Sequence, residues 1–194
     1  DENQMADRVT DILTKIDSEA KNEPFPFSVA VGHSHGSGKD ILEIVKTADY
    51  VSIFLCDIKY FSSELSTKYS KAPSYYKYAK ESFLTMVKLK PLSFYENGIM
   101  KSGVILRHLV LPSHRRDSIA ILEDIAKQVD PSLFKLSLMS QYTPDFCPKE
   151  YSELCRRVTT FEYNSVLRRA CELGYDGYMQ DISSATSSFT PDFS

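Results

Sequence analysis

The hydrophobic and polar positions of this 194-residue chain alternate between two patterns. Four short, mainly apolar runs are typical of buried strands: residues 25–31, 50–60, 104–111 and 134–139. Five segments carry apolar residues at helical spacing: residues 5–20, 40–48, 70–90, 117–129 and 160–173. Strands that alternate with helices predict an α/β fold with a mainly parallel sheet and outer helices.

Several residues predict where these elements begin and end. Pro73 lies near the first turn of the helix over 70–90. Asp117 is placed to cap the N-terminus of the following helix, and Gly174 to close the last one. Asn97-Gly98 predicts a tight turn before the apolar run at 104–111.

Composition and charge narrow the classes of partner. Charged residues make up 25% of the chain and hydrophobic residues 42%, as in soluble globular proteins. The net charge of −3 gives no basic field for nucleic acid or an anionic membrane. No apolar run approaches the roughly 18 residues of a membrane helix, and no secretory leader is visible. We therefore expect a cytoplasmic protein without nucleic-acid or membrane partners.

The cysteines and histidines give no metal motif. Cys56, Cys147, Cys155 and Cys171 lack knuckle spacing, which predicts reduced thiols and neither a disulfide scaffold nor a metal site. His33 and His35 form a His-x-His pair without an evident third ligand.

Two further motifs are better explained by ordinary structural roles than by ligand binding. The glycine-rich segment 32–40 resembles a phosphate loop but has His33 where the motif needs glycine and Asp40 where it needs a hydroxyl, so a surface turn is favoured. Lysines and tyrosines interleave over 68–80, which a helix with a lysine-bearing outer face explains better than binding of single-stranded nucleic acid.

Charges inside two apolar runs are the stronger signal. The period of two places Asp57 and Lys59 on one strand face near its carboxyl end, where parallel α/β folds build their sites. Arg107 lies within the next run and needs an anion if it is buried. Either Asp57 pairs internally with Arg107 or Lys59, or Lys59 and Arg107 face a carboxylate-bearing ligand. His108 points to the opposite face and is predicted to be a packed or capping residue.

Residues 50–194 resemble the C-terminal part of radical S-adenosylmethionine proteins of the pyruvate formate-lyase activating enzyme-like kind. Four separate stretches carry the resemblance: VSIFLCDIKYFSSELSTKYSKAPSYY, GVILRHLVLPSHRRDS, LSLMSQYTPDF and LGYDGYMQDISSATSSFTPDF. The resemblance implies a partial (β/α) barrel with S-adenosylmethionine lying across the strand ends and, in intact members, a protein substrate or small substrate.

The same resemblance implies site residues. The family's D-x-K element falls on Asp57 and Lys59, and its strand arginine falls on Arg107. These residues would help to hold the methionine and ribose parts of S-adenosylmethionine. Ser140, Gln141 and Tyr142, in the loop after the last predicted strand, would form a further rim of the site. No catalytic residue is assigned.

The chain departs from the family at the cluster site. The family holds a [4Fe–4S] cluster with C-x₃-C-x₂-C, and this sequence has no such spacing of thiolates. We therefore expect a truncated activase-like protein that is inactive alone and retains part of the S-adenosylmethionine site. The alternative is a non-enzymatic regulatory or interaction module, which could self-associate through exposed sheet edges.

Residues 1–49 resemble the tail of GGDEF diguanylate cyclase domains. The stretches are ADRVTDILTKIDSEA, FPFSVAVGHSHG and DILEIVKTAD. The catalytic GGDEF turn is absent, so no cyclase activity is expected. Together with the missing initiating Met, this suggests either two fused fragments joined near Asp49, with parts 1–49 and 50–194, or a genuine first barrel unit at 25–60.

Overall fold

The computed structural model describes residues 28–31, 44–45, 48–49, 51–145 and 147–179. The predicted helix at 5–20, the glycine-rich segment 32–40 with its two histidines, and the segment from 180 onward lie outside the described residues. Of the predicted helix at 40–48, Ile44 and Val45 are helical, and Ile44 and Ala48 are buried.

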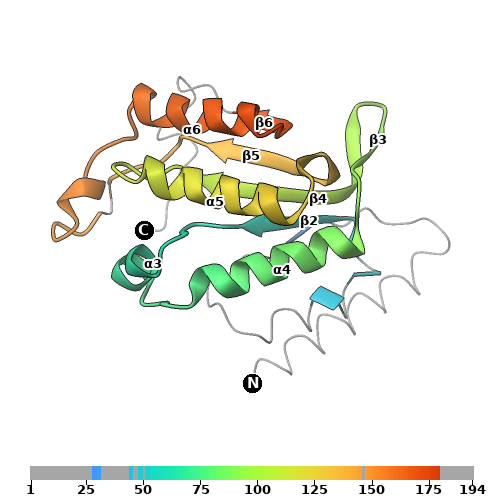
Figure 1. Cartoon of the computed structure of the whole chain (residues 1–194), viewed down its shortest axis with the longest axis horizontal. Coiled ribbons are helices and arrows are strands. Elements are labelled where there is room, and N and C mark those ends of the chain that lie inside the picture. Colours follow the sequence, from blue (N-terminus) through green and yellow to red (C-terminus); the bar gives the residue numbers. More distant parts are fainter. Residues whose placement is uncertain (1–27, 32–43, 46–47, 50, 146, 180–194) are drawn as a thin grey trace.

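The described strands form one six-stranded sheet (Figure 1). They are β1 (Ser28–Val31), β2 (Ile53–Asp57), β3 (Phe94–Glu96), β4 (Ile99–Leu109), β5 (Lys135–Met139) and β6 (Gly177–Met179). The order is β1-β2-β4-β5-β6 with every neighbouring pair parallel, and β3 pairs antiparallel with β4. The predicted α/β fold with a mainly parallel sheet is therefore confirmed.

Helices connect the parallel strands, as a parallel ladder requires. They are α3 (Ser63–Ser70), α4 (Tyr75–Leu89), α5 (Arg115–Gln128) and α6 (Thr160–Glu172), with short 3₁₀ turns at Pro131–Leu133 and Ser152–Leu154. Helix α4 packs on β2 and β4, and α5 packs beside α6 (Figure 1). Among the described residues, no helix has both the length and the apolar character needed to cross a membrane.

The sheet has two unlike faces. Cys56, Leu106 and Leu136 stand in one register row, and all are fully buried in the core beneath the helices. The adjacent row, Asp57 and Arg107 with Ser137, is only half-buried. The helices thus cover the first face, and the second face keeps the charged residues in reach of solvent at the strand ends.

Several helices and strands begin or end at other residues than predicted. The strand at 50–60 is confined to Ile53–Asp57, α4 begins at Tyr75 rather than at residue 70, and α3 and β3 were not predicted.

The Asn97-Gly98 turn is confirmed: both residues have positive φ, and they join β3 to β4 in a hairpin. Gly174 follows α6 with φ of 80°, as predicted for a residue that closes a helix.

The prediction that Asp117 caps its own helix was wrong. Helix α5 begins at Arg115 with His114 as its N-cap. The Asp117 carboxylate instead accepts hydrogen bonds from the backbone N–H groups of Phe61 (2.7 Å) and Ser62 (2.9 Å). Asp117 therefore ties the segment after β2 to α5, a long-range role that spacing along the chain cannot show.

Gly177 in β6 gives a test of how the last strand packs. Its φ is 149°, and a Cβ at this position would collide with the backbone carbonyl of Leu136 on β5. Gly98 also has a positive φ, of 77°, but faces open space. We expect Gly98→Ala to cost about 1 kcal/mol from the backbone conformation alone. Gly177→Ala should cost about 2–4 kcal/mol, because overpacking adds to that term.

Urea unfolding of the two variants and the unchanged chain measures both costs. Equal losses of stability in the two variants would show that β6 does not approach β5 as closely as described.

Candidate functional site

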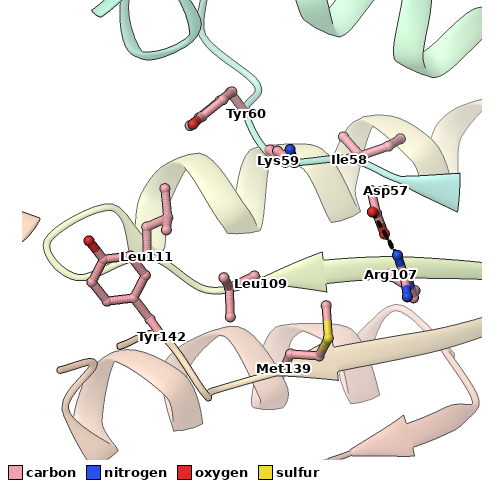
Figure 2. A pocket seen from close by; sticks show the side chains of 9 residues that line it. All are labelled: Asp57, Ile58, Lys59, Tyr60, Arg107, Leu109, Leu111, Met139 and Tyr142. Carbon is pink, nitrogen blue, oxygen red and sulfur yellow. Dashed lines mark hydrogen bonds and ion pairs between the residues drawn. The ribbon is translucent and has the colours of Figure 1, made fainter. Parts of the chain in front are cut away.

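A pocket of about 400 Å³ opens at the carboxyl ends of β2, β4 and β5 (Figure 2). This size falls in the range of small-molecule sites, roughly 300–1,000 Å³. Its lining combines three charged residues, two tyrosines and an apolar wall: Asp57, Lys59, Arg107, Tyr60, Tyr142, Ile58, Leu109, Leu111 and Met139. Carboxyl ends of parallel strands are where α/β folds bind ligands.

Asp57 and Arg107 form a two-pronged ion pair in the pocket wall (Figure 2). They stand opposite each other in the β2–β4 register, with Nε to Oδ1 at 2.6 Å and Nη2 to Oδ2 at 2.8 Å. The hydrogen bonds from the guanidinium to Asp57 raise the pKa of Arg107 above its usual value. The internal Asp57–Arg107 pair that the sequence offered as one alternative is therefore present.

Lys59 is the pocket's uncompensated charge. Its side chain is exposed, and within the described part of the chain no carboxylate forms an ion pair with it. The second internal alternative, an Asp57–Lys59 pair, is not among the ion pairs formed by the described residues. With one carboxylate against two cations, the three charged residues leave a net positive charge at the pocket mouth.

The backbone that carries Asp57 and Lys59 is fixed from the helix side. The hydroxyl of Tyr75, on α4, donates to the carbonyl oxygen of Asp57 (3.0 Å) and accepts from the backbone N–H of Lys59 (3.0 Å). Tyr75 is buried, and this burial raises its pKa, so the hydroxyl keeps its proton. One tyrosine thus holds both ends of the D-x-K element.

His108 contacts the same backbone segment, at Ile58, from the helix-covered side of the sheet. Its ring is 1% exposed, and Nδ1 lies 2.6 Å from the carbonyl oxygen of Ile58. Because a carbonyl can only accept, Nδ1 is the protonated nitrogen. Burial lowers the pKa of His108, so the ring is neutral. The predicted packed histidine is confirmed.

The two pocket tyrosines differ in burial: Tyr60 is buried and Tyr142 is half-buried. Tyr60 accepts a hydrogen bond from the Ser70 hydroxyl at 3.1 Å. Burial and the neighbouring Cys147 raise the pKa of Tyr142 to about 12. Both side chains offer a ring face and a hydroxyl, so the pocket can accept a ligand with a flat ring and polar substituents.

The structure brings four of the predicted site residues together and leaves two outside the pocket lining. Asp57, Lys59, Arg107 and Tyr142 line it. Ser140 and Gln141 follow β5 without lining it, Ser140 being buried and Gln141 half-buried. The period of two places Leu109 and Leu111 on the same face as Arg107, and both line the pocket with it.

Tyr60 and Met139 also line the pocket and were not predicted as site residues. Their only signal is that each lies at or just after the end of a strand.

The residues present do not fit an iron–sulfur cluster. The sequence lacks the C-x₃-C-x₂-C spacing, and the described residues contain no group of three His, Cys, Asp or Glu side chains that could hold a metal ion.

Comparison with known proteins finds sequence similarity to an archaeal protein. No protein-family model matches it. Over 127 residues, 65% of this chain, it is 29% identical to an uncharacterized protein of Methanocaldococcus jannaschii. The match spans 33% of that protein, so this chain corresponds to about a third of its relative.

The Asp57–Arg107 pair can be tested by a double-mutant cycle. Asp57→Asn leaves a half-buried guanidinium without its counter-ion, and Arg107→Met leaves the carboxylate unpaired. We expect each single change to lower the free energy of unfolding by about 1–2 kcal/mol, since both side chains are partly exposed. The double variant should lose less than the sum of the two. Additive losses in urea unfolding would show that the pair is not coupled.

His108 predicts a specific pH dependence of stability. Its pKa is lowered by burial, so below the ordinary value of about 6.5 the unfolded chain takes up a proton that the folded chain does not. Stability should fall as pH decreases through that value. His108→Asn retains a donor for the Ile58 carbonyl without this proton uptake, so its pH profile should be flatter by up to about 1.4 kcal/mol per pH unit. Parallel profiles from pH 7 to pH 5 would contradict this assignment.

Proposed function

We propose that the pocket at the ends of β2, β4 and β5 binds S-adenosylmethionine, in a chain that forms the C-terminal part of a radical S-adenosylmethionine-like (β/α) barrel. The observation that carries the proposal is Lys59, an exposed cation at the mouth of a mainly apolar pocket, beside the Asp57–Arg107 pair. The proposal assigns ligand binding to this chain and no catalytic step, because the cluster ligands are missing from it.

The topology supports the barrel part of the proposal. The parallel strands follow one another in chain order, helices cross between them, and the pocket lies at their carboxyl ends. Barrel enzymes place their ligand sites at this end of the strands. The half-buried charged row on the face away from the helices would then face the barrel interior.

The pocket chemistry supports the ligand class. S-adenosylmethionine joins a zwitterionic amino acid to a nucleoside through a sulfonium. The Lys59 ammonium can pair with the ligand carboxylate, and the Asp57 carboxylate, already held by Arg107, can accept a hydrogen bond from an ammonium or a ribose hydroxyl. Leu109, Leu111 and Met139 offer an apolar surface to the adenine ring.

A second candidate function has its own observation. Leu92, Phe94 and Ile99, at and around the β3–β4 hairpin, are each more than 60% exposed. The hairpin projects beyond the rest of the sheet (Figure 1). Exposed apolar side chains gathered on one projection are typical of a protein–protein contact. They favour the interaction module as the alternative, with self-association as its simplest form.

Titration calorimetry with S-adenosylmethionine tests the leading proposal. We expect saturable binding that Lys59→Ala weakens by about tenfold or more, because a charge-assisted hydrogen bond contributes about 1.5–3 kcal/mol. Lys59→Arg should retain most of the affinity. Lys88→Ala is the matched control, since Lys88 is an exposed lysine on α4 away from the pocket.

Two binding outcomes and one sedimentation outcome separate the alternatives. Absence of binding to the folded chain, or equal affinity in the Lys59→Ala variant, would overturn the ligand proposal. Sedimentation of the same samples measures self-association independently. Dimers lost in a Phe94→Asp, Ile99→Asp variant would favour the interaction module.

A further inference from the structure

Two thiols that sequence spacing left unrelated converge in the loop between β5 and α6. Cys155 donates a hydrogen bond from its Sγ to the Sγ of Cys147, with the sulfur atoms 3.0 Å apart. Both thiols also point at the backbone carbonyl oxygens of Pro148 and Tyr151, at 3.4–3.7 Å. Cys155 is exposed and Cys147 is partly exposed, so small thiol reagents can reach the pair.

The loop that carries the thiols is anchored by groups other than the cysteines. The Tyr151 hydroxyl donates to the backbone carbonyl of Lys68 at 3.0 Å, and Glu153 accepts hydrogen bonds from the side chains of Lys68 and Tyr69. Those hydrogen bonds lower the pKa of Glu153 to about 2, so its contacts persist at neutral pH. Leu154 is buried next to them. The two sulfur atoms are therefore held close before any bond joins them.

We propose that Cys147 and Cys155 are a reversible dithiol–disulfide site that reacts with small-molecule disulfides of the glutathione class. Few rearrangements are needed, because the sulfur atoms have only about 1 Å to close to reach a disulfide bond of about 2.05 Å. A metal site is less favoured, because structural zinc takes four ligands and the described residues supply no third His, Cys, Asp or Glu here.

The reaction balances with one oxidant molecule. The Cys155 thiol, the more exposed of the two, loses its proton, and its thiolate attacks one sulfur of glutathione disulfide. One glutathione leaves as a thiolate, and a mixed disulfide forms on Cys155. The Cys147 thiolate then attacks the Cys155 sulfur and releases the second glutathione. The protein loses two hydrogen atoms and two electrons, and glutathione disulfide is reduced to two thiols.

The site lies against the wall of the pocket. Tyr142 lines the pocket, and the neighbouring Cys147 contributes to the raised pKa of the Tyr142 hydroxyl. Oxidation removes the proton of the Cys147 thiol and shifts its sulfur toward Cys155. The disulfide would therefore change the surroundings of Tyr142 directly, whether or not the pocket binds S-adenosylmethionine.

Mass spectrometry of the full chain after incubation with glutathione disulfide tests the proposal. We expect a loss of two hydrogen atoms without a retained glutathione adduct. Trypsin cleaves after Lys149, between the two cysteines, so the bond should join peptide 136–149 to peptide 150–156. Dithiothreitol should release the two peptides. Calorimetry with S-adenosylmethionine is not needed, so failure of the proposed function leaves this result intact.

Serine variants and a measurement of zinc binding distinguish the disulfide proposal from its alternatives. Cys147→Ser and Cys155→Ser should each abolish the linked peptide, with a stable glutathione adduct accumulating on the remaining thiol. Cys171→Ser, which removes an exposed thiol on α6, should leave the link unchanged. Stable adducts without a link in the folded unchanged chain would overturn the proposal. So would tight, one-to-one binding of zinc alone that both serine variants abolish.

Discussion

The parallel register between β2 and β4 is the constraint on which the described site depends. It sets Asp57 directly opposite Arg107, so two charges that would each be costly on a half-buried face satisfy each other. Two hydrogen bonds from the guanidinium neutralise Asp57. Lys59 therefore gives the pocket its net positive charge. A shift of one residue would turn Arg107 into the apolar core and separate the pair.

The difference between the two sheet faces explains why a pocket can exist there. Large apolar side chains from α4, α5 and α6 fill the space over one face, and the buried strand residues belong to that side. The other face carries intermediate burial and charge, so its strand ends stay open to a ligand. Tyr75 and His108 connect the two faces, because each reaches from the helix side to the backbone of residues 57–59.

The loop after β5 gives the same end of the sheet a second chemistry. Tyr142 belongs to the pocket, and a few residues later Cys147 meets Cys155. Contacts of Tyr151 and Glu153 with α3 hold that loop beside the segment that follows β2. Ligand binding at the strand ends and thiol chemistry in the loop would therefore act on adjacent atoms.

The apolar runs by themselves determined the α/β class, the parallel sheet and the chain positions of the main helices, because buried strands and amphipathic helices need those patterns wherever they pack. The period of two likewise placed Asp57, Lys59 and the apolar neighbours of Arg107 on one face. Only the tertiary structure decided that Asp57 pairs with Arg107, that Asp117 holds another segment, and that Cys147 meets Cys155. These contacts join residues that are not neighbours in the sequence. They depend on the strand register and on the course of the loops, and residue spacing along the chain determines neither of these.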